Sequence, residues 1–243
     1  MLSACIKSEQ LKIRRSYIWI AFFLTPLVPA FMGTMNYMNN LALLKSEWFS
    51  LWTQQTLFYS NFFFSPLIAV YCSYLWRMEN MNKNRNMIMT APVPVRDIFL
   101  GKLIVIAKAV FLIQLWVYVL FVLSGWLVHL PGLPPLQTLF YIFRGLLGGL
   151  AVAALQLLLS MVIRSFALPI AIAIIGSVTG LLAANTAAGF LYPYSLMMLG
   201  MNANRSEDML AGNGIIFFAS ALLYICLFCG IAVLLLKRQD VKA

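Results

Sequence analysis

Long apolar runs separated by short polar stretches dominate the chain. Each run is about 20 residues long, the length at which an α-helix crosses about 30 Å of hydrocarbon. The alternating segments of a membrane β-barrel do not occur. The pattern therefore predicts an all-α polytopic membrane protein, a single domain over residues 1–243. Its six expected spans are 17–34, 56–76, 103–128, 136–163, 166–188 and 215–236.

The positions of the basic residues predict the topology. An even number of spans places both termini on one side. Of the 17 Lys and Arg residues, only Lys45 and Arg205 lie in loops of the opposite side, and Arg144 lies within a span. Because cytoplasmic loops carry an excess of Lys and Arg, both termini are expected in the cytoplasm. Pro26 and Pro29 interrupt the first run and no small-residue cleavage site follows, so we expect a retained span.

The first 16 residues mix Leu and Ile with four basic side chains. Such a segment is predicted to lie as an amphipathic helix in the headgroup region. It either fixes the topology or also contacts a cytoplasmic partner. The net charge of +10 is explained by the topological bias and by attraction to anionic lipid. Nucleic-acid binding is not expected, because no basic soluble domain is present.

Titratable side chains are too few and too scattered for an enzyme site. The chain has one His and seven acidic residues, without paired carboxylates or a nucleophile–base arrangement. We predict no catalytic residue, no metal site and no cofactor bound by this chain. Cys226 and Cys229 lie one helical turn apart in an apolar run and are interpreted as packing residues. The phosphate-binding pattern G-x-x-x-x-G-K-[ST] does not occur, so ATP would have to be bound by another polypeptide.

Several residues of the outer half were considered for contact with substrate or lipid. Arg144 lies about 12 Å inside the fourth span, where it either reaches the outer headgroups or faces the protein interior and meets a phosphate or peptide carboxylate. The aromatic candidates are Trp48, Trp52, Tyr192 and Tyr194, for which anchoring at the membrane surface is an equal explanation. The third outer loop is expected to begin with a short helix that dips back. Small residues four apart in the fourth and fifth spans predict tight helix packing, within or between chains.

The polar segment 77–102 is the largest cytoplasmic connection. A methionine-rich helical stretch is ended by Pro92 and Pro94, which disfavour helix. "VRDIFLGK" then starts the next helix, with Asp97 near its N-terminus, where negative charge is favourable. The segment is either a rigid module that transmits movement from a soluble motor or a simple charged reversal.

This segment resembles the corresponding loop of type-2 ABC exporter permeases. Glu79 is followed by "TAPVPVRDIFLGK", which contains Pro92, Pro94, Arg96 and the Gly101–Lys102 pair. The six-span layout and the amphipathic N-terminus are similar over nearly the whole chain. The stretch "NMNKNRN" after Glu79, the length and the missing ATPase most resemble permeases of lantibiotic-immunity and bacitracin-resistance exporters.

The resemblance implies a permease subunit in the bacterial cytoplasmic membrane that expels an amphipathic antimicrobial peptide, or a lipid-linked substrate. It implies two copies of a separate ATPase, which would bind ATP and Mg²⁺, and a second identical or paralogous permease. The implied coupling residues are Glu79, Lys83, Arg85, Pro92, Pro94, Arg96, Asp97 and Lys102. Two alternatives stay open: a membrane scaffold or sensor that docks a regulatory protein, and an ion-coupled secondary carrier.

Overall fold

The computed structural model describes residues 1–14, 16–81, 92–205, 207–208 and 210–238, and this part of the chain is helical without a strand. The helices are α1 (Leu2–Arg14), α2 (Ile18–Leu24), α3 (Leu27–Asn39), α4 (Glu47–Phe58), the π-helix η1 (Tyr59–Phe63), α5 (Phe64–Asn80), α7 (Val95–Leu127), α8 (Leu136–Val162), α9 (Ala167–Ala184), the 3₁₀ helix η3 (Ala187–Leu191), α10 (Ser195–Met201) and α11 (Gly214–Lys237).

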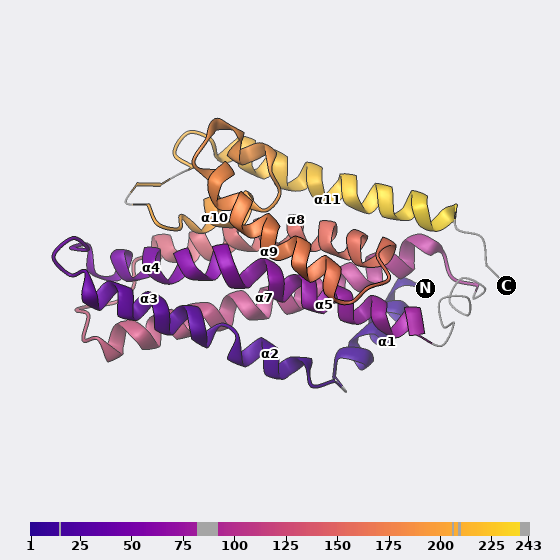
Figure 1. Cartoon of the computed structure of the whole chain (residues 1–243), viewed down its shortest axis with the longest axis horizontal. Coiled ribbons are helices and arrows are strands. Elements are labelled where there is room, and N and C mark those ends of the chain that lie inside the picture. Colours follow the sequence, from indigo (N-terminus) through magenta and orange to yellow (C-terminus); the bar gives the residue numbers. More distant parts are fainter. Residues whose placement is uncertain (15, 82–91, 206, 209, 239–243) are drawn as a thin grey trace.

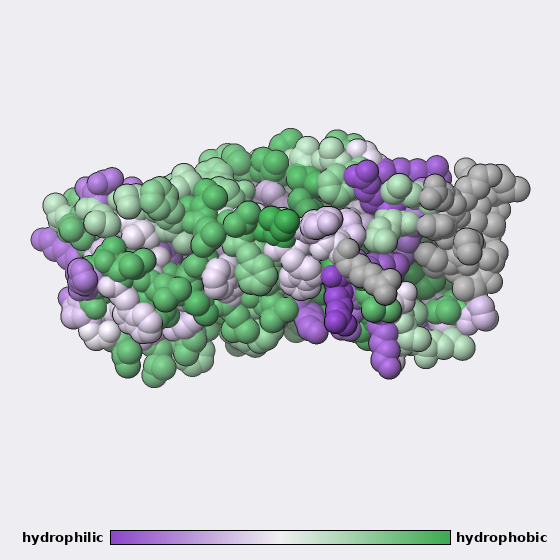
Figure 2. Space-filling model, turned by 90° about the horizontal axis from the view of Figure 1, so that it is seen from below, coloured by the Kyte–Doolittle hydropathy of each residue, from purple (hydrophilic) through white to green (hydrophobic). Residues whose placement is uncertain are grey.

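Five helical segments of the described chain are long and apolar enough to cross a membrane: Ile18–Asn39, Val95–Leu127, Leu136–Val162, Ala167–Ala184 and Gly214–Lys237. They match five of the six expected spans. Figure 1 shows the long helices side by side along the long axis of the molecule, with α1 and the end of α11 at the same end. Figure 2 shows a largely hydrophobic face whose hydrophilic side chains gather toward the two ends. The protein is thus a multi-pass membrane protein.

The expected second span is not among these five helices. Residues 56–76 are helical throughout, but they belong to α4, η1 and α5, which follow one another directly. Ser60 and Asn61 are buried here, and their side chains donate hydrogen bonds of 2.7 Å to the carbonyls of Thr56 and Leu57. Ser and Asn are hydrophilic residue types and therefore lower the mean hydropathy of the segment, while the hydrogen bonds to the backbone allow them to be buried. The six-span count therefore stays a prediction.

Prolines mark two helix boundaries that the sequence predicted. The third long helix begins at Val95, directly after Pro94, as the stretch "VRDIFLGK" predicted, and it continues without a break through the expected span 103–128. Arg96, Asp97 and Lys102 consequently belong to the first turns of α7. The first span is divided between α2 and α3 at Pro26, which has no amide hydrogen to donate to the preceding turn.

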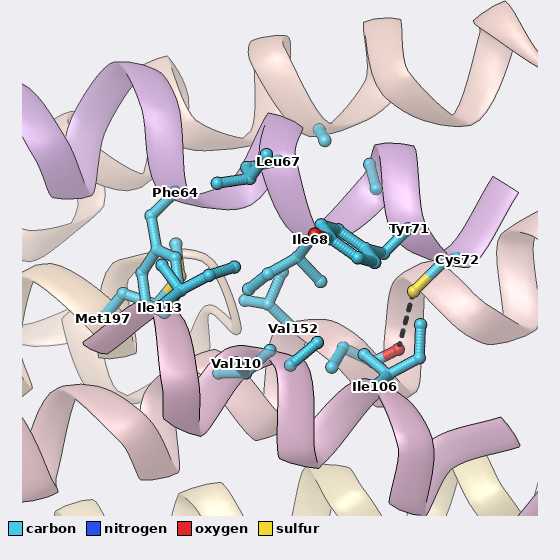
Figure 3. Close-up of a cluster of buried hydrophobic side chains, with 14 of the residues drawn as sticks. Phe64, Leu67, Ile68, Tyr71, Cys72, Ile106, Val110, Ile113, Val152 and Met197 are labelled. Carbon is cyan, nitrogen blue, oxygen red and sulfur yellow. Dashed lines mark hydrogen bonds between the residues drawn. The ribbon is translucent and has the colours of Figure 1, made fainter. Parts of the chain in front are cut away.

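The core lies between α5, α7, α8 and α10. Figure 3 shows side chains of α5, α7, α8 and α10 meeting there, including Phe64, Ile68, Val110, Val152 and Met197, all at most 1% exposed. A buried cluster of this kind excludes both lipid and water from the centre of the bundle.

The expected short helix of the third outer loop is present as α10, and all its residues are buried. It packs against α8 and α9. A Cβ atom on Gly148 would lie 2.7 Å from the carbonyl carbon of Leu196, so only glycine admits α10 this close. The small residues of α8 and α9 therefore serve packing within the chain: Gly145, Gly149 and Gly180 face residues of other helices, and Gly176 faces the ring of Tyr194.

Candidate functional site

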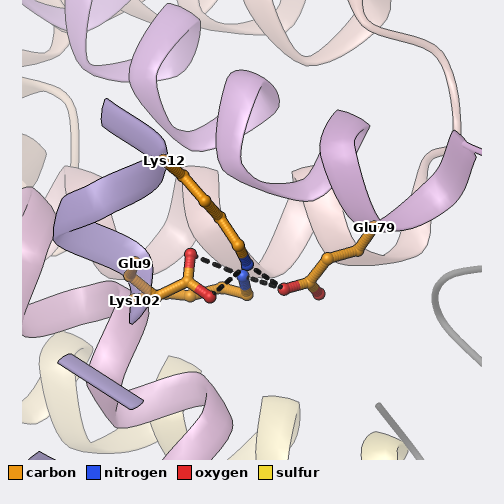
Figure 4. Close-up of polar contacts among 4 residues, drawn as sticks. All are labelled: Glu9, Lys12, Glu79 and Lys102. Atoms are coloured by element: carbon orange, nitrogen blue, oxygen red, sulfur yellow. Dashed lines mark hydrogen bonds and ion pairs between the residues drawn. The ribbon is translucent and has the colours of Figure 1, made fainter. Parts of the chain in front are cut away.

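Three helices bring four charged side chains together at the α1 end of the molecule. Glu9 and Lys12 lie three positions apart on α1 and therefore share one face of it. Glu79 lies in the last turn of α5, and Lys102 lies in the second turn of α7. Figure 4 shows the four side chains pointing toward one another, and we call them the charge cluster.

The cluster alternates two ammonium groups with two carboxylates. Lys102 Nζ contacts Glu79 Oε1 and lies 2.9 Å from Glu9 Oε2. Lys12 Nζ lies 3.1 Å from the same Glu79 oxygen and 2.5 Å from Glu9 Oε1. Each cation thus touches both anions, and the formal charges of the four groups cancel.

The charged side chains of the cluster are largely buried, which raises the energetic cost of losing any one of their contacts. The side chain of Lys102 is 0% exposed and that of Glu79 is 3% exposed, whereas Lys12 keeps 21%. Lys102 Nζ also lies 4.9 Å above the ring of Trp76, a favourable cation–π distance. A buried charge costs several kcal/mol unless it is paired, so removal of one partner from such a group typically costs about 3–5 kcal/mol.

The charge of Lys12 is stabilised by its neighbours. Burial lowers the pKa of its ammonium, but the negative charges of Glu79 and Glu9 and their hydrogen bonds outweigh burial, and the net pKa is raised. Lys12 is therefore charged at neutral pH and completes the cluster.

The packing of α1 on α7 explains the Gly101–Lys102 pair. A Cβ on Gly101 would lie 2.9 Å from Cys5 Cβ, so the glycine lets α1 lie directly on α7. The next residue, Lys102, then reaches Glu9 across this contact. The pair holds the N-terminal helix against the start of α7.

The structure brings together only part of the predicted coupling residues. Glu79 and Lys102 belong to the charge cluster. Pro92, Pro94 and Arg96 are exposed, and Arg96 Nε lies 3.5 Å from Asp97 Oδ1. Lys83 and Arg85 lie outside the described residues. Sequence reasoning missed Glu9 and Lys12, although their spacing on an amphipathic helix was a signal that this face carries opposite charges.

Arg144 makes a further ion pair, outside the charge cluster. Its Nη1 lies 2.8 Å and 2.9 Å from the two carboxylate oxygens of Asp208, in the connection between α10 and α11. The guanidinium also lies 5.6 Å from the centre of the Tyr141 ring. The partner of Arg144 in the structure is thus a carboxylate of the protein itself, and contact with lipid or cargo stays a prediction.

The predicted aromatic contact residues have packing partners. Trp48 and Trp52 are 3% and 0% exposed. The Trp52 indole donates a hydrogen bond of 2.8 Å to the carbonyl of Met201, and the Trp48 indole donates one of 2.8 Å to the carbonyl of Pro131. Both side chains thus fasten α4 to neighbouring segments and have almost no surface for lipid or substrate.

The two tyrosines lie directly before α10. Tyr194 is buried, and its hydroxyl accepts a hydrogen bond of 2.6 Å from the Gln156 amide on α8. Tyr192 is partly exposed, and its hydroxyl lies 2.7 Å from Thr179 on α9. They hold α10 between these two helices.

The described residues contain no group of three or more His, Cys, Asp or Glu side chains that could hold a metal ion. The charge cluster connects helices to one another. It joins the end of α5, the start of α7 and α1 through charges that have little access to water.

Comparison with known proteins agrees with this arrangement. The model of the family described as "ABC-2 family transporter protein" matches residues 5–180, which include the charge cluster and most of the long helices. No curated protein matches the chain significantly. Members of this family are the membrane components of ABC transporters and work with an ABC ATPase. The chain belongs to the ABC-2 family of transporter proteins and is a membrane permease.

Proposed function

We propose that this permease is the membrane subunit of an exporter driven by a separate ATPase, which docks on the segment between α5 and α7. The observation that carries the proposal is the charge cluster. It ties Glu79, just before this segment, to Lys102, just after it, and ties both to α1. A force applied to the segment would therefore move three helices together. ATP and Mg²⁺ would be held by the ATPase.

The exposed surface of the segment supports the same proposal. Arg96 lies in the first turn of α7 and has a side chain that is 72% exposed. Pro92 and Pro94 precede it, and each fixes its own backbone angle φ. An exposed charge on a stiff backbone, at the start of the helix that carries the buried Lys102, suits a contact that transmits movement. We assign the contact with the ATPase to this edge, together with Lys83 and Arg85 of the preceding residues.

The cargo that we propose is an amphipathic antimicrobial peptide of the lantibiotic type, removed from the membrane for self-protection. Its passage would require a second permease, identical or related. A broad apolar surface is available for such a neighbour: α11 buries only Phe217, Ala221, Ala232 and Leu236 within the described chain. The remaining faces of α11 would contact lipid or the second permease.

Two measurements test the function. The tagged chain is purified from its own membrane, and the proteins held with it are identified. We expect an ATPase with a phosphate-binding loop, in a one-to-one ratio. Sealed inverted vesicles containing both subunits are then loaded with a fluorescent lantibiotic, and we expect ATP to drive the peptide across or out of the bilayer.

Other outcomes would point to other functions. A kinase, or no ATPase, held by the purified chain would favour a scaffold or sensor. Movement of the peptide by an ion gradient, without ATP, would favour a secondary carrier. A complex that hydrolyses ATP but leaves the lantibiotic in place would keep the ABC permease and reject this cargo.

A further inference from the structure

A pocket of about 210 Å³ lies between α1, α2 and α7, separate from the charge cluster. Arg14 of α1 and Lys108 of α7 line it from two sides, with Trp19 of α2. Its floor is apolar and includes Ile13, Val105 and Leu112. A pocket with two cations over an apolar floor suits a ligand with an anionic head and an apolar body.

The two cations have no carboxylate partner among the described residues. Neither Arg14 nor Lys108 takes part in an ion pair there, in contrast to Lys12 and Lys102. Glu9 is on the same helix as Arg14 but is already bound in the charge cluster. The pocket therefore carries two positive charges that the protein does not neutralise.

The pocket lies where the chain turns from α1 into the membrane. The turn is short: the Ser16 hydroxyl donates to the carbonyl of Ile13 at 3.0 Å and accepts from the amide of Ile18 at 3.3 Å. Arg14 is the last residue of α1, and α2 begins at Ile18. Because an amphipathic α1 would lie in the headgroup region, a cationic pocket at this turn would lie near the depth of the lipid phosphates.

Exposed apolar side chains continue from the pocket along both neighbouring helices. They are Ile20, Phe23 and Leu24 on α2, and Phe111 and Leu115 on α7. The Trp116 indole of α7 donates a hydrogen bond of 3.2 Å to the carbonyl of Phe23, which keeps the two helices together beyond the pocket. An acyl chain could lie along this surface while the head remains between the cations.

We infer that this pocket binds the phosphate of an anionic phospholipid in the leaflet at the α1 end of the molecule. Arg14 and Lys108 would hold the phosphate, Trp19 would contact the glycerol region, and the acyl chains would follow α2 and α7. Because this lipid would touch both α1 and α7, its binding would stabilise the docking of the N-terminal helix. The inference does not depend on the transported cargo or on the ATPase.

The test is native mass spectrometry of the purified full chain with added phosphatidylglycerol or phosphatidylcholine. We expect preferential retention of phosphatidylglycerol. The double variant Arg14→Gln/Lys108→Gln should retain it about tenfold less, since each basic residue contributes to attraction of anionic lipid. The control Lys7→Gln/Lys237→Gln removes the same charge from exposed positions at the same end of the molecule and should bind like the unchanged protein.

Equal retention by the double variant, or an equal loss in the control, would overturn the inference. Displacement of the lipid by millimolar inorganic phosphate would show a site for a small anion and would also overturn it. A second measurement needs no variant: phosphatidylglycerol with a photoreactive acyl chain should label residues of α2 and α7 beside the pocket. Labelling confined to other helices would contradict the assignment even if the double variant failed to fold.

Discussion

The buried ammonium of Lys102 contacts the carboxylate of Glu79, so the last turn of α5 and the second turn of α7 are joined by an ion pair. The two ends of the segment between these helices are therefore joined by charges. Glu9 and Lys12 extend the same group to α1. Since buried ions are costly when unpaired, the arrangement favours the three helices staying in register.

Replacing Lys102 with Met should destabilise the fold strongly. The change leaves Glu9 and Glu79 facing each other with Lys12 as their shared cation, and the expected loss is about 3–5 kcal/mol. Thermal unfolding of the purified protein in detergent measures it. Lys7→Met changes the same residue type at an exposed position of α1 and should have an effect within about 0.5 kcal/mol. Equal stability of both variants would show that the buried pairs do not hold these helices.

Reversing the charge of Arg96 should uncouple the permease from its ATPase. Because the side chain is 72% exposed, Arg96→Glu should leave stability and membrane insertion nearly unchanged. Substrate-stimulated ATP hydrolysis by the assembled complex should fall to the unstimulated rate. Lys237→Glu, at the exposed end of α11, is the matched charge reversal and should keep stimulation. Normal stimulation in Arg96→Glu would argue against the assigned contact.

The ion pair between Arg144 and Asp208 should be measurable as a coupling energy. Both side chains are partly exposed, 23% and 33%, so solvent screens the pair and about 1 kcal/mol is expected. The single variants Arg144→Ala and Asp208→Ala, with their combination, form the double-mutant cycle. Strictly additive effects on unfolding would mean that the contact contributes nothing to the position of the third outer loop.

The close approach of α10 to α8 predicts different effects for two glycines. Gly148→Ala would place a carbon 2.7 Å from backbone atoms of Leu196 and should destabilise the protein by about 1–3 kcal/mol. Gly230→Ala lies within α11, where nothing is within 4 Å of the added carbon, and alanine should be neutral or stabilising there. Comparison of the two melting temperatures tests the packing. Similar shifts would show that α10 is free to move away from α8.

Hydropathy predicted most of the helices because long apolar runs have few alternatives in lipid. The expected second span is the exception, because its helices are not apolar enough or not long enough to count as a span. Its polar residues, such as Ser60 and Asn61, are buried and hydrogen-bonded to their own backbone, and local composition does not show this burial. The division of the first span at Pro26 had a clear chemical signal, the missing amide hydrogen.

The site was harder to predict than the spans. Glu9 and Lys102 are distant in sequence, and their contact depends on α1 lying on α7, which no local pattern specifies. The positions of Trp48 and Trp52 could not be predicted from local sequence either. A tryptophan near a span end fits the membrane surface and the protein core equally well by composition, and only the hydrogen bonds to Pro131 and Met201 distinguish the two. The exposure of Arg96, Pro92 and Pro94 agrees with the polar composition of the segment around them, and their role in coupling stays a prediction.

The unbroken course of α7 has a further consequence. Its 33 residues make a rod of about 50 Å, well beyond the thickness of about 30 Å of hydrocarbon. One rigid body thus begins beside the charge cluster and ends near the opposite surface. A tilt of about 5° at one end would displace the other by about 4 Å over this length, so a small rotation on one side of the bilayer becomes a stroke large enough to repack side chains on the other.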